Sequence, residues 1–274
     1  MDVKLADNYG FCFGVKRAIK IAEESPNSHT IGPLIHNPKE INRLQSDFNV
    51  DVVEEIDDLK EGERAIVRTH GIEKEKLQIL KDKNLDVIDA TCPYVTKPQE
   101  IVASMSEEGY DIVIFGDIKH PEVKGVKSYA TTPVHVVLSS EELEHVRLKD
   151  RIAIVSQTTK REEDFLKLVN YLVGHYKEVR VFNTICNATF DNQSAAKKLA
   201  TEVDVMLIIG GKNSSNTKQL HEIALQHCAD SYLIEGADDI NPEWFKGKKV
   251  CGITAGASTP DWIVQNVISS VRRI

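Results

Sequence analysis

Three cysteines occupy equivalent places in the chain, each between a predicted β-strand and a predicted helix. The strand residues and the cysteines that follow them are 3–6 with Cys12, 85–88 with Cys92, and 178–182 with Cys186. A thiol at the start of a helix lies near unpaired amide N–H groups and the positive end of the helix dipole, which favours the thiolate form. Because the thiolate is the form that binds metals, the pattern predicts three metal ligands.

The spacing of these cysteines favours an iron–sulfur cluster over a structural zinc site. A closed zinc site has four ligands, commonly in closely spaced pairs, and none of the three has another cysteine within four residues. An iron–sulfur cluster accepts ligands from distant segments, and three protein thiolates leave one iron open. An open iron binds a substrate oxygen as a Lewis acid and passes electrons. We expect the other two, Cys228 in a helical run at 218–229 and Cys251 in an apolar strand, to be buried core residues.

The elements around the cysteines repeat three times. We expect α/β units at residues 12–91, 92–185 and 186–274, the last completed by an N-terminal strand within residues 1–11. Alternating strands and helices imply mainly parallel sheets, whose ligand-binding loops lie beyond the carboxyl ends of the strands. Packing of the three units around a pseudo-threefold axis would direct these loops into one central cavity.

Composition limits the class of protein. The chain has 274 residues, 41% of them hydrophobic, and no apolar run approaches the roughly 20 residues that span a bilayer. Its N-terminus lacks a signal-peptide core, and five cysteines, an odd number, argue against a disulfide framework. We therefore expect a soluble cytoplasmic protein without a membrane partner. A net charge of −8 gives no basic footprint for nucleic acid, and an anionic ligand would need a locally positive pocket.

Six motifs in this order closely resemble those of the 4-hydroxy-3-methylbut-2-enyl diphosphate reductase family. They are residues 10–15 (GFCFGV), 89–93 (DATCP), 119–123 (KHPEV), 157–159 (QTT), 213–216 (NSSN) and 254–258 (TAGAS). The resemblance implies a trefoil of three α/β domains around a [4Fe-4S] cluster. It also implies the last step of the methylerythritol phosphate route to isoprenoids, in which two electrons and two protons convert the allylic alcohol diphosphate to isopentenyl and dimethylallyl diphosphate.

The resemblance also implies roles for individual residues. Cys12, Cys92 and Cys186 would ligate the cluster, Glu122 would donate the proton, and Thr158 would hold or relay at the substrate hydroxyl. The diphosphate would be bound by polar residues of the ligand loops: His36, His70, His120, Ser214, Ser215, Asn216 and Ser258. Since the sequence contains no nucleotide-binding fingerprint, electrons are expected from a separate ferredoxin or flavodoxin.

Structural alternatives exist for several of these residues. The sequence from His36 to Pro38 could begin a helix without binding a ligand. Residues 213–216 could likewise serve as a helix cap alone, and Glu122 could interact with a helix dipole without a catalytic role. Two other functions also fit the motifs in part. An open-iron cluster suits a hydro-lyase that needs no reductant, and a zinc- or phosphate-binding scaffold would need no catalysis at all.

Overall fold

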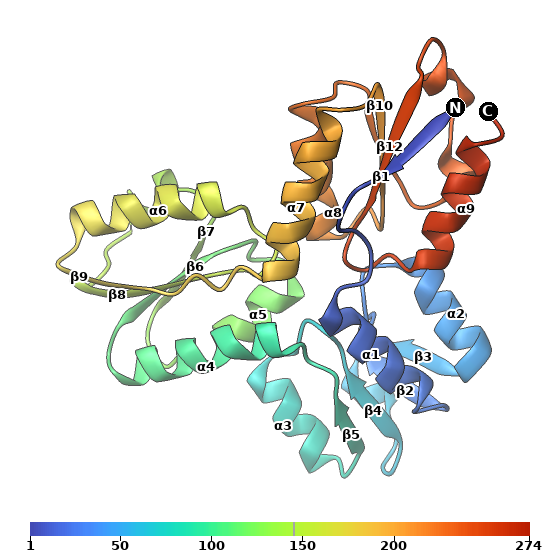
Figure 1. Ribbon diagram of the computed structural model, residues 1–274. Coiled ribbons are helices and arrows are strands. Elements are labelled where there is room, and N and C mark those ends of the chain that lie inside the picture. The colour runs from blue at the N-terminus through green and yellow to red at the C-terminus, as the bar shows by residue number, and fades with distance from the viewer. Residues whose placement is uncertain (145) are drawn as a thin grey trace. The chain divides into compact units, whose positions relative to one another are not determined.

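The computed structural model describes residues 1–144 and 146–274 (Figure 1). Within these ranges, the chain forms three four-stranded parallel sheets with equivalent strand orders. In spatial order the strands are β1 (Asp2–Leu5), β12 (Val250–Ala255), β10 (Val205–Ile209) and β11 (Ser231–Ile234) in sheet A; β5 (Asp86–Asp89), β4 (Arg64–Val67), β2 (Ser28–Ile31) and β3 (Val50–Val53) in sheet B; and β9 (Glu178–Val181), β8 (Arg151–Ser156), β6 (Asp111–Phe115) and β7 (Val134–Val137) in sheet C. The predicted α/β class, with three similar units built on parallel sheets, is confirmed.

In each sheet, the strand that precedes a cysteine lies at the same edge. β5 and β9 hold this place in sheets B and C, and β1 holds it in sheet A. β1 pairs in parallel with β12, so that Asp2 lies opposite Val250 and Leu5 opposite Ile253. The first strand of the chain therefore completes the sheet formed by its last third, and all three cysteines follow equivalent edge strands.

Nine α-helices occur in the described residues, and each of the three cysteines directly precedes one of them. The helices are α1 (Phe13–Glu23), α2 (Pro38–Phe48), α3 (Lys74–Asp82), α4 (Pro93–Glu107), α5 (Pro121–Lys127), α6 (Glu162–His175), α7 (Asn187–Ala200), α8 (Ser215–Leu225) and α9 (Asp261–Val271). Pro93 is the first residue of α4, where its fixed φ suits a helix and its missing N–H is not needed. Cys92 before it has extended backbone angles, so the helix begins immediately after the thiol.

The cores show why these sequences form sheets covered by helices. The five residues of β6 are all buried, and alternate side chains of this strand enter two different cores. Ile112 and Ile114 pack with residues of α4 and α5, while Val113 and Phe115 pack with residues of α6. An apolar strand of this kind must be covered on both faces, which is typical of parallel sheets.

The chain divides into two compact units. The first unit contains residues 1–16, 35–43 and 187–274 and includes sheet A, and the second unit contains residues 17–34 and 44–186 and includes sheets B and C. None of the described helices is both long and apolar enough to cross a membrane.

Candidate active site

Each of the three cysteines makes the same backbone contact with a neighbouring loop. Its N–H donates to a carbonyl that follows the adjacent strand of the same sheet. The pairs are Cys12 with Ala257 at 3.3 Å, Cys92 with Thr69 at 3.0 Å, and Cys186 with Thr158 at 3.0 Å. These contacts fix each thiol beside a loop with a predicted ligand residue, which is Ser258, His70 or Thr158 itself. The threefold repeat seen in the sequence therefore extends to individual hydrogen bonds.

The two groups of cysteines differ in burial. Cys12, Cys92 and Cys186 are partly exposed, whereas Cys228 and Cys251 are buried with 7% and 0% of their surface accessible. Burial raises the pKa of the Cys251 thiol to about 12, which keeps it protonated. The expected burial of both residues is confirmed, but the expected position of Cys228 within a helix is wrong because α8 ends at Leu225. The donor set of partly exposed thiols at helix starts fits a metal cluster.

A carboxyl group and a hydroxyl group meet beside Cys186 in the second compact unit, which contains sheets B and C. Glu122 is 2% exposed, and its two carboxylate oxygens accept hydrogen bonds from the Thr158 N–H at 2.6 Å and the Thr158 Oγ1 at 2.7 Å. The Glu122 carboxylate thus accepts hydrogen bonds from a loop 36 residues away in sequence, and not from the start of its own helix. The backbone carbonyl oxygen of Thr158 also accepts a hydrogen bond from the Cys186 N–H, so Thr158 connects the carboxyl group to a predicted cluster ligand.

The environment of Glu122 favours the protonated carboxyl group. Burial raises its pKa, and the two hydrogen bonds from Thr158 and the positive charge of Lys160 offset only part of this effect. A carboxyl group that keeps its proton closer to neutral pH is suited to general-acid catalysis. The sequence reasoning missed Lys160, although its position two residues after Thr158 was a usable signal.

Two histidines lie close together near this carboxyl group. His120 caps α5, because its Nδ1 accepts the Glu122 N–H at 3.2 Å. The His70 and His120 rings meet edge to face, with 5.5 Å between centroids. Since Nδ1 of His120 is an acceptor, the proton of its neutral ring is on Nε2, which can donate to an anionic oxygen. The second unit therefore holds six predicted site residues: Cys92, Cys186, His70, His120, Glu122 and Thr158.

The first unit holds the other predicted site residues, which are Cys12, His36, Ser214, Ser215, Asn216 and Ser258. Ser214 caps α8 by accepting the Thr217 N–H at 3.3 Å, as the structural alternative expects. Asn216 is 3% exposed, and among the described residues neither of its amide atoms has a hydrogen-bond partner. A buried amide without a partner is costly, and at the positive end of a helix it suits a bound anion.

His36 lies beside the loop that leads to Ser214. A Cβ atom at Gly211 would collide with the His36 carbonyl oxygen, so only glycine allows this close approach. The following Asn37 caps α2, because its Oδ1 accepts the Glu40 N–H at 3.1 Å. The segment therefore begins a helix, as the structural alternative predicts, and also places His36 in the same unit as the Ser214 loop.

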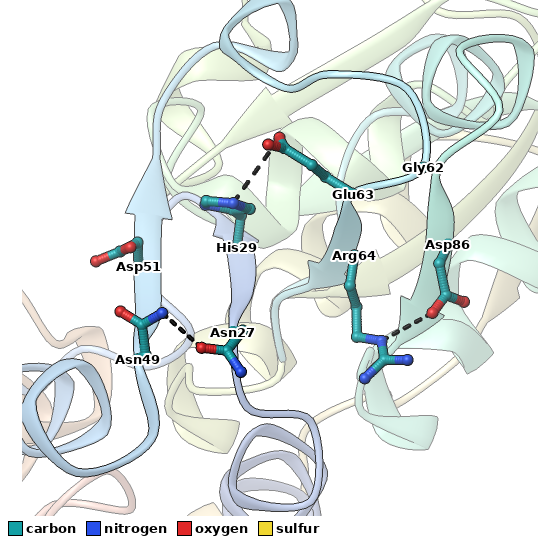
Figure 2. Close-up of a pocket in the computed structure, with 8 residues that line it drawn as sticks. All are labelled: Asn27, His29, Asn49, Asp51, Gly62, Glu63, Arg64 and Asp86. Atoms are coloured by element: carbon teal, nitrogen blue, oxygen red, sulfur yellow. Dashed lines mark hydrogen bonds and ion pairs between the residues drawn. The ribbon is translucent and has the colours of Figure 1, made fainter.

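A polar cavity of about 420 Å³ lies at the opposite end of sheet B, near the amino ends of its strands (Figure 2). Figure 2 shows the ion pairs of His29 with Glu63 at 3.9 Å and Arg64 with Asp86 at 2.8 Å. None of the predicted site residues lines it. Ligand loops of parallel sheets lie at the carboxyl ends of the strands, so we assign the site to the cysteine end of sheet B.

Glu122→Gln should change how the stability of the protein depends on pH. The raised pKa means that the folded state binds a proton more tightly than the unfolded state. The free energy of unfolding of the natural protein should therefore fall, relative to the variant, as pH rises from about 4.5 to the folded pKa, by up to about 1.4 kcal/mol per pH unit. Urea unfolding of both proteins at several pH values measures the difference. A difference that is constant from acid to neutral pH would contradict the raised pKa.

The fold and the site define a class of protein: three parallel-sheet α/β units, each with one cysteine at a helix start. The chain belongs to the LytB protein family, whose sequence model matches residues 3–272. It is 66% identical over its full length, and over 99% of the relative, to the 4-hydroxy-3-methylbut-2-enyl diphosphate reductase of a Nitratiruptor species.

Two solved structures also match the whole fold. One is of (E)-4-hydroxy-3-methyl-but-2-enyl diphosphate reductase, described as the terminal enzyme of the non-mevalonate pathway. It is 46% identical, with a TM-score of 0.73 and coverage of 100% of this chain and 99% of the other. The other is E-1-hydroxy-2-methyl-but-2-enyl-4-diphosphate reductase from Plasmodium falciparum, at 28% identity, a TM-score of 0.92 and coverage of 98% and 87%. The resemblance seen in the sequence motifs is therefore confirmed.

Proposed function

We propose that this chain is a reductase that converts 4-hydroxy-3-methylbut-2-enyl diphosphate to isopentenyl and dimethylallyl diphosphate, the last step of the methylerythritol phosphate pathway. The carbon–oxygen bond of the allylic alcohol breaks, and the hydroxyl group takes up one proton and leaves as water. The two electrons and the second proton form the new carbon–hydrogen bond. The observation that carries the proposal is the buried Glu122 carboxyl group, which hydrogen bonds to Thr158 beside Cys186. Family membership and the names of the relatives support the same reaction.

Cys12, Cys92 and Cys186 would hold a [4Fe-4S] cluster. The support is their shared position before α1, α4 and α7, their partial exposure and their repeated backbone contact. When bound, such a cluster supplies electrons and an iron that is open to an oxygen ligand. The electrons would come from a ferredoxin or flavodoxin in the cytoplasm.

Glu122 would hold the proton that the leaving hydroxyl group needs. Its raised pKa keeps a fraction of the carboxyl group protonated at a pH where an ordinary glutamate is ionised. Thr158 fixes the carboxyl group with two hydrogen bonds, and its hydroxyl group would orient the substrate alcohol for proton transfer. Two groups of the chain thus act on one oxygen atom.

The diphosphate would be bound by side chains that donate hydrogen bonds: His36, His70, His120, Ser214, Ser215, Asn216 and Ser258. Hydroxyl, amide and imidazole N–H groups can donate hydrogen bonds to an anion without requiring lysine or arginine, and the start of α8 adds its dipole. These donors would supply the locally positive site that an acidic chain needs for an anionic substrate.

Asn216→Leu should separate binding from stability. Leucine is similar in size, and it removes two buried polar atoms that have no partner among the described residues. We expect the affinity for inorganic diphosphate to fall about tenfold or more, while the free energy of unfolding stays equal or rises by about 1–3 kcal/mol. Calorimetric titration and urea unfolding measure the two effects.

A matched control for that variant is Asn241→Leu. Asn241 accepts the Glu243 N–H at the start of a short 3₁₀ helix. Its replacement should cost about 1 kcal/mol of stability and leave diphosphate affinity unchanged. If Asn216→Leu binds diphosphate as well as the natural protein, Asn216 is not a ligand.

The function is tested by anaerobic purification, iron and sulfide analysis, and turnover of the diphosphate substrate with a reduced dye as electron donor. We expect iron and acid-labile sulfide in equal amounts and turnover only when reductant is present. Turnover without reductant would favour the hydro-lyase. Equimolar zinc without sulfide would favour the scaffold, and either result would reject the proposal.

A further inference from the structure

The segment that carries His36 is attached to a part of the chain far away in sequence. Residues 35–43 belong to the compact unit of residues 187–274, although the residues on both sides of the segment belong to the other unit. Specific contacts within the first compact unit must therefore hold the segment. They are made by three residues at or just before the start of α2.

Two of these contacts are a backbone contact with a buried glycine and an exposed ion pair. The His36 backbone packs against Gly211, and the Lys39 Nζ lies 3.0 Å from Asp238 Oδ2. Asp238 is almost fully exposed, with 90% of its side-chain surface accessible. Exposed ion pairs contribute little to stability, so Lys39 alone does not explain why the segment is held.

The third contact is buried. Glu40 is 1% exposed, and each of its carboxylate oxygens has a partner. Arg43 donates to Oε1 at 2.7 and 3.1 Å, and the indole N–H of Trp262 donates to Oε2 at 3.0 Å. A hydrogen bond to a buried charged group is strong and directional. The Trp262–Glu40 bond therefore fixes the start of α2 relative to the start of α9.

This bond connects the ligand loops of the first unit. Trp262 comes four residues after Ser258, and Glu40 comes four residues after His36. Gly211, against which the His36 carbonyl packs, precedes Ser214 by three residues. The Ser258 loop, the Ser214 loop and the His36 segment are thus attached to one another by one glycine contact and one indole hydrogen bond.

We propose that Trp262 and Glu40 are positioning residues that hold His36 in place for the diphosphate group of the substrate. The inference rests on the proposed function, because it assumes that His36 binds the diphosphate. Neither Trp262 nor Glu40 needs to touch the substrate. Their effect is on the orientation of a ligand residue before binding, which lowers the cost of ordering the site.

Trp262→Phe tests the inference, because it removes the indole N–H and keeps an aromatic ring. We expect KM for the substrate and Kd for inorganic diphosphate to rise about tenfold, while kcat stays within about twofold of the natural value. The reason is that the lost interaction stabilises the bound substrate and the transition state equally. The holoenzyme is used for KM and kcat, and calorimetry gives Kd. Trp244→Phe is the matched control, since the Trp244 ring stacks on Tyr232, with 4.0 Å between ring centroids.

A double-variant cycle shows whether Trp262 acts through His36. His36→Leu combined with Trp262→Phe should bind diphosphate no more weakly than His36→Leu alone, within about twofold. Additive losses, or a Trp262→Phe protein that binds like Trp244→Phe, would overturn the inference. If His36→Leu itself has no effect, the role proposed for His36 fails first. Should Trp262→Phe not fold, Glu40→Met removes the acceptor of the same hydrogen bond and should raise Kd equally; an unchanged Kd would overturn the inference.

Discussion

Glu122→Gln is expected to reduce kcat by about 10²–10⁴-fold, the usual contribution of a general acid. Glutamine preserves the shape of the side chain and can still accept a hydrogen bond from Thr158, but it has no proton to donate at neutral pH. The iron and sulfide content and the visible spectrum should not change, because Glu122 is not one of the predicted cluster ligands and is connected to Cys186 through the Thr158 backbone. Steady-state kinetics with a reduced dye, alongside iron analysis, measures both quantities.

Asp111→Asn is the matched control for this result. Asp111 is also a buried carboxylate, 3% exposed, but it accepts the Lys149 N–H at the amino end of β6, at the opposite end of its sheet from Cys186. Its replacement should leave kcat within about threefold of the natural protein while affecting stability. A Glu122→Gln protein that retained kcat to the same extent would remove Glu122 from the role of proton donor.

Cys92→Ser should abolish the cluster and the activity together. A serine hydroxyl is a poor ligand compared with a thiolate, and the loss of one of only three ligands cannot be compensated from within the site. Since even an outer-shell change costs about 10–100-fold in metal affinity, we expect activity to fall by about 100-fold or more. Iron and sulfide analysis of anaerobically purified protein measures the cluster, and circular dichroism verifies that the fold is intact.

Cys228→Ala provides the comparison for the cysteine variants. Cys228 is buried in the core of sheet A with residues of α7 and α8 and does not precede a helix. The variant should lose some stability through the cavity that it leaves but should keep full iron and sulfide content. Full iron content in Cys92→Ser, with normal turnover, would show that Cys92 is not a ligand.

The sequence by itself determined the repeated local structure. The apolar run of β6, the proline that begins α4 and the cysteine before it are local features, because strand periodicity and helix-start geometry depend on neighbouring residues. The six motifs were sufficient to indicate the family. The helix that was expected to contain Cys228 was extended too far, since where a helix ends depends on the packing of the following residues as well as on propensity.

Only the tertiary structure decided how the groups of the site act on one another. Glu122 and Thr158 are 36 residues apart, and no local pattern predicts that Thr158 donates two hydrogen bonds to a carboxylate that is 2% exposed. The bond from Trp262 to Glu40 spans 222 residues. Burial raises the pKa of Glu122, and the Trp262–Glu40 bond positions a predicted ligand, through atoms that are distant in sequence. The chemistry of this site therefore depends on packing, whereas the residue types that form it could be identified from the sequence.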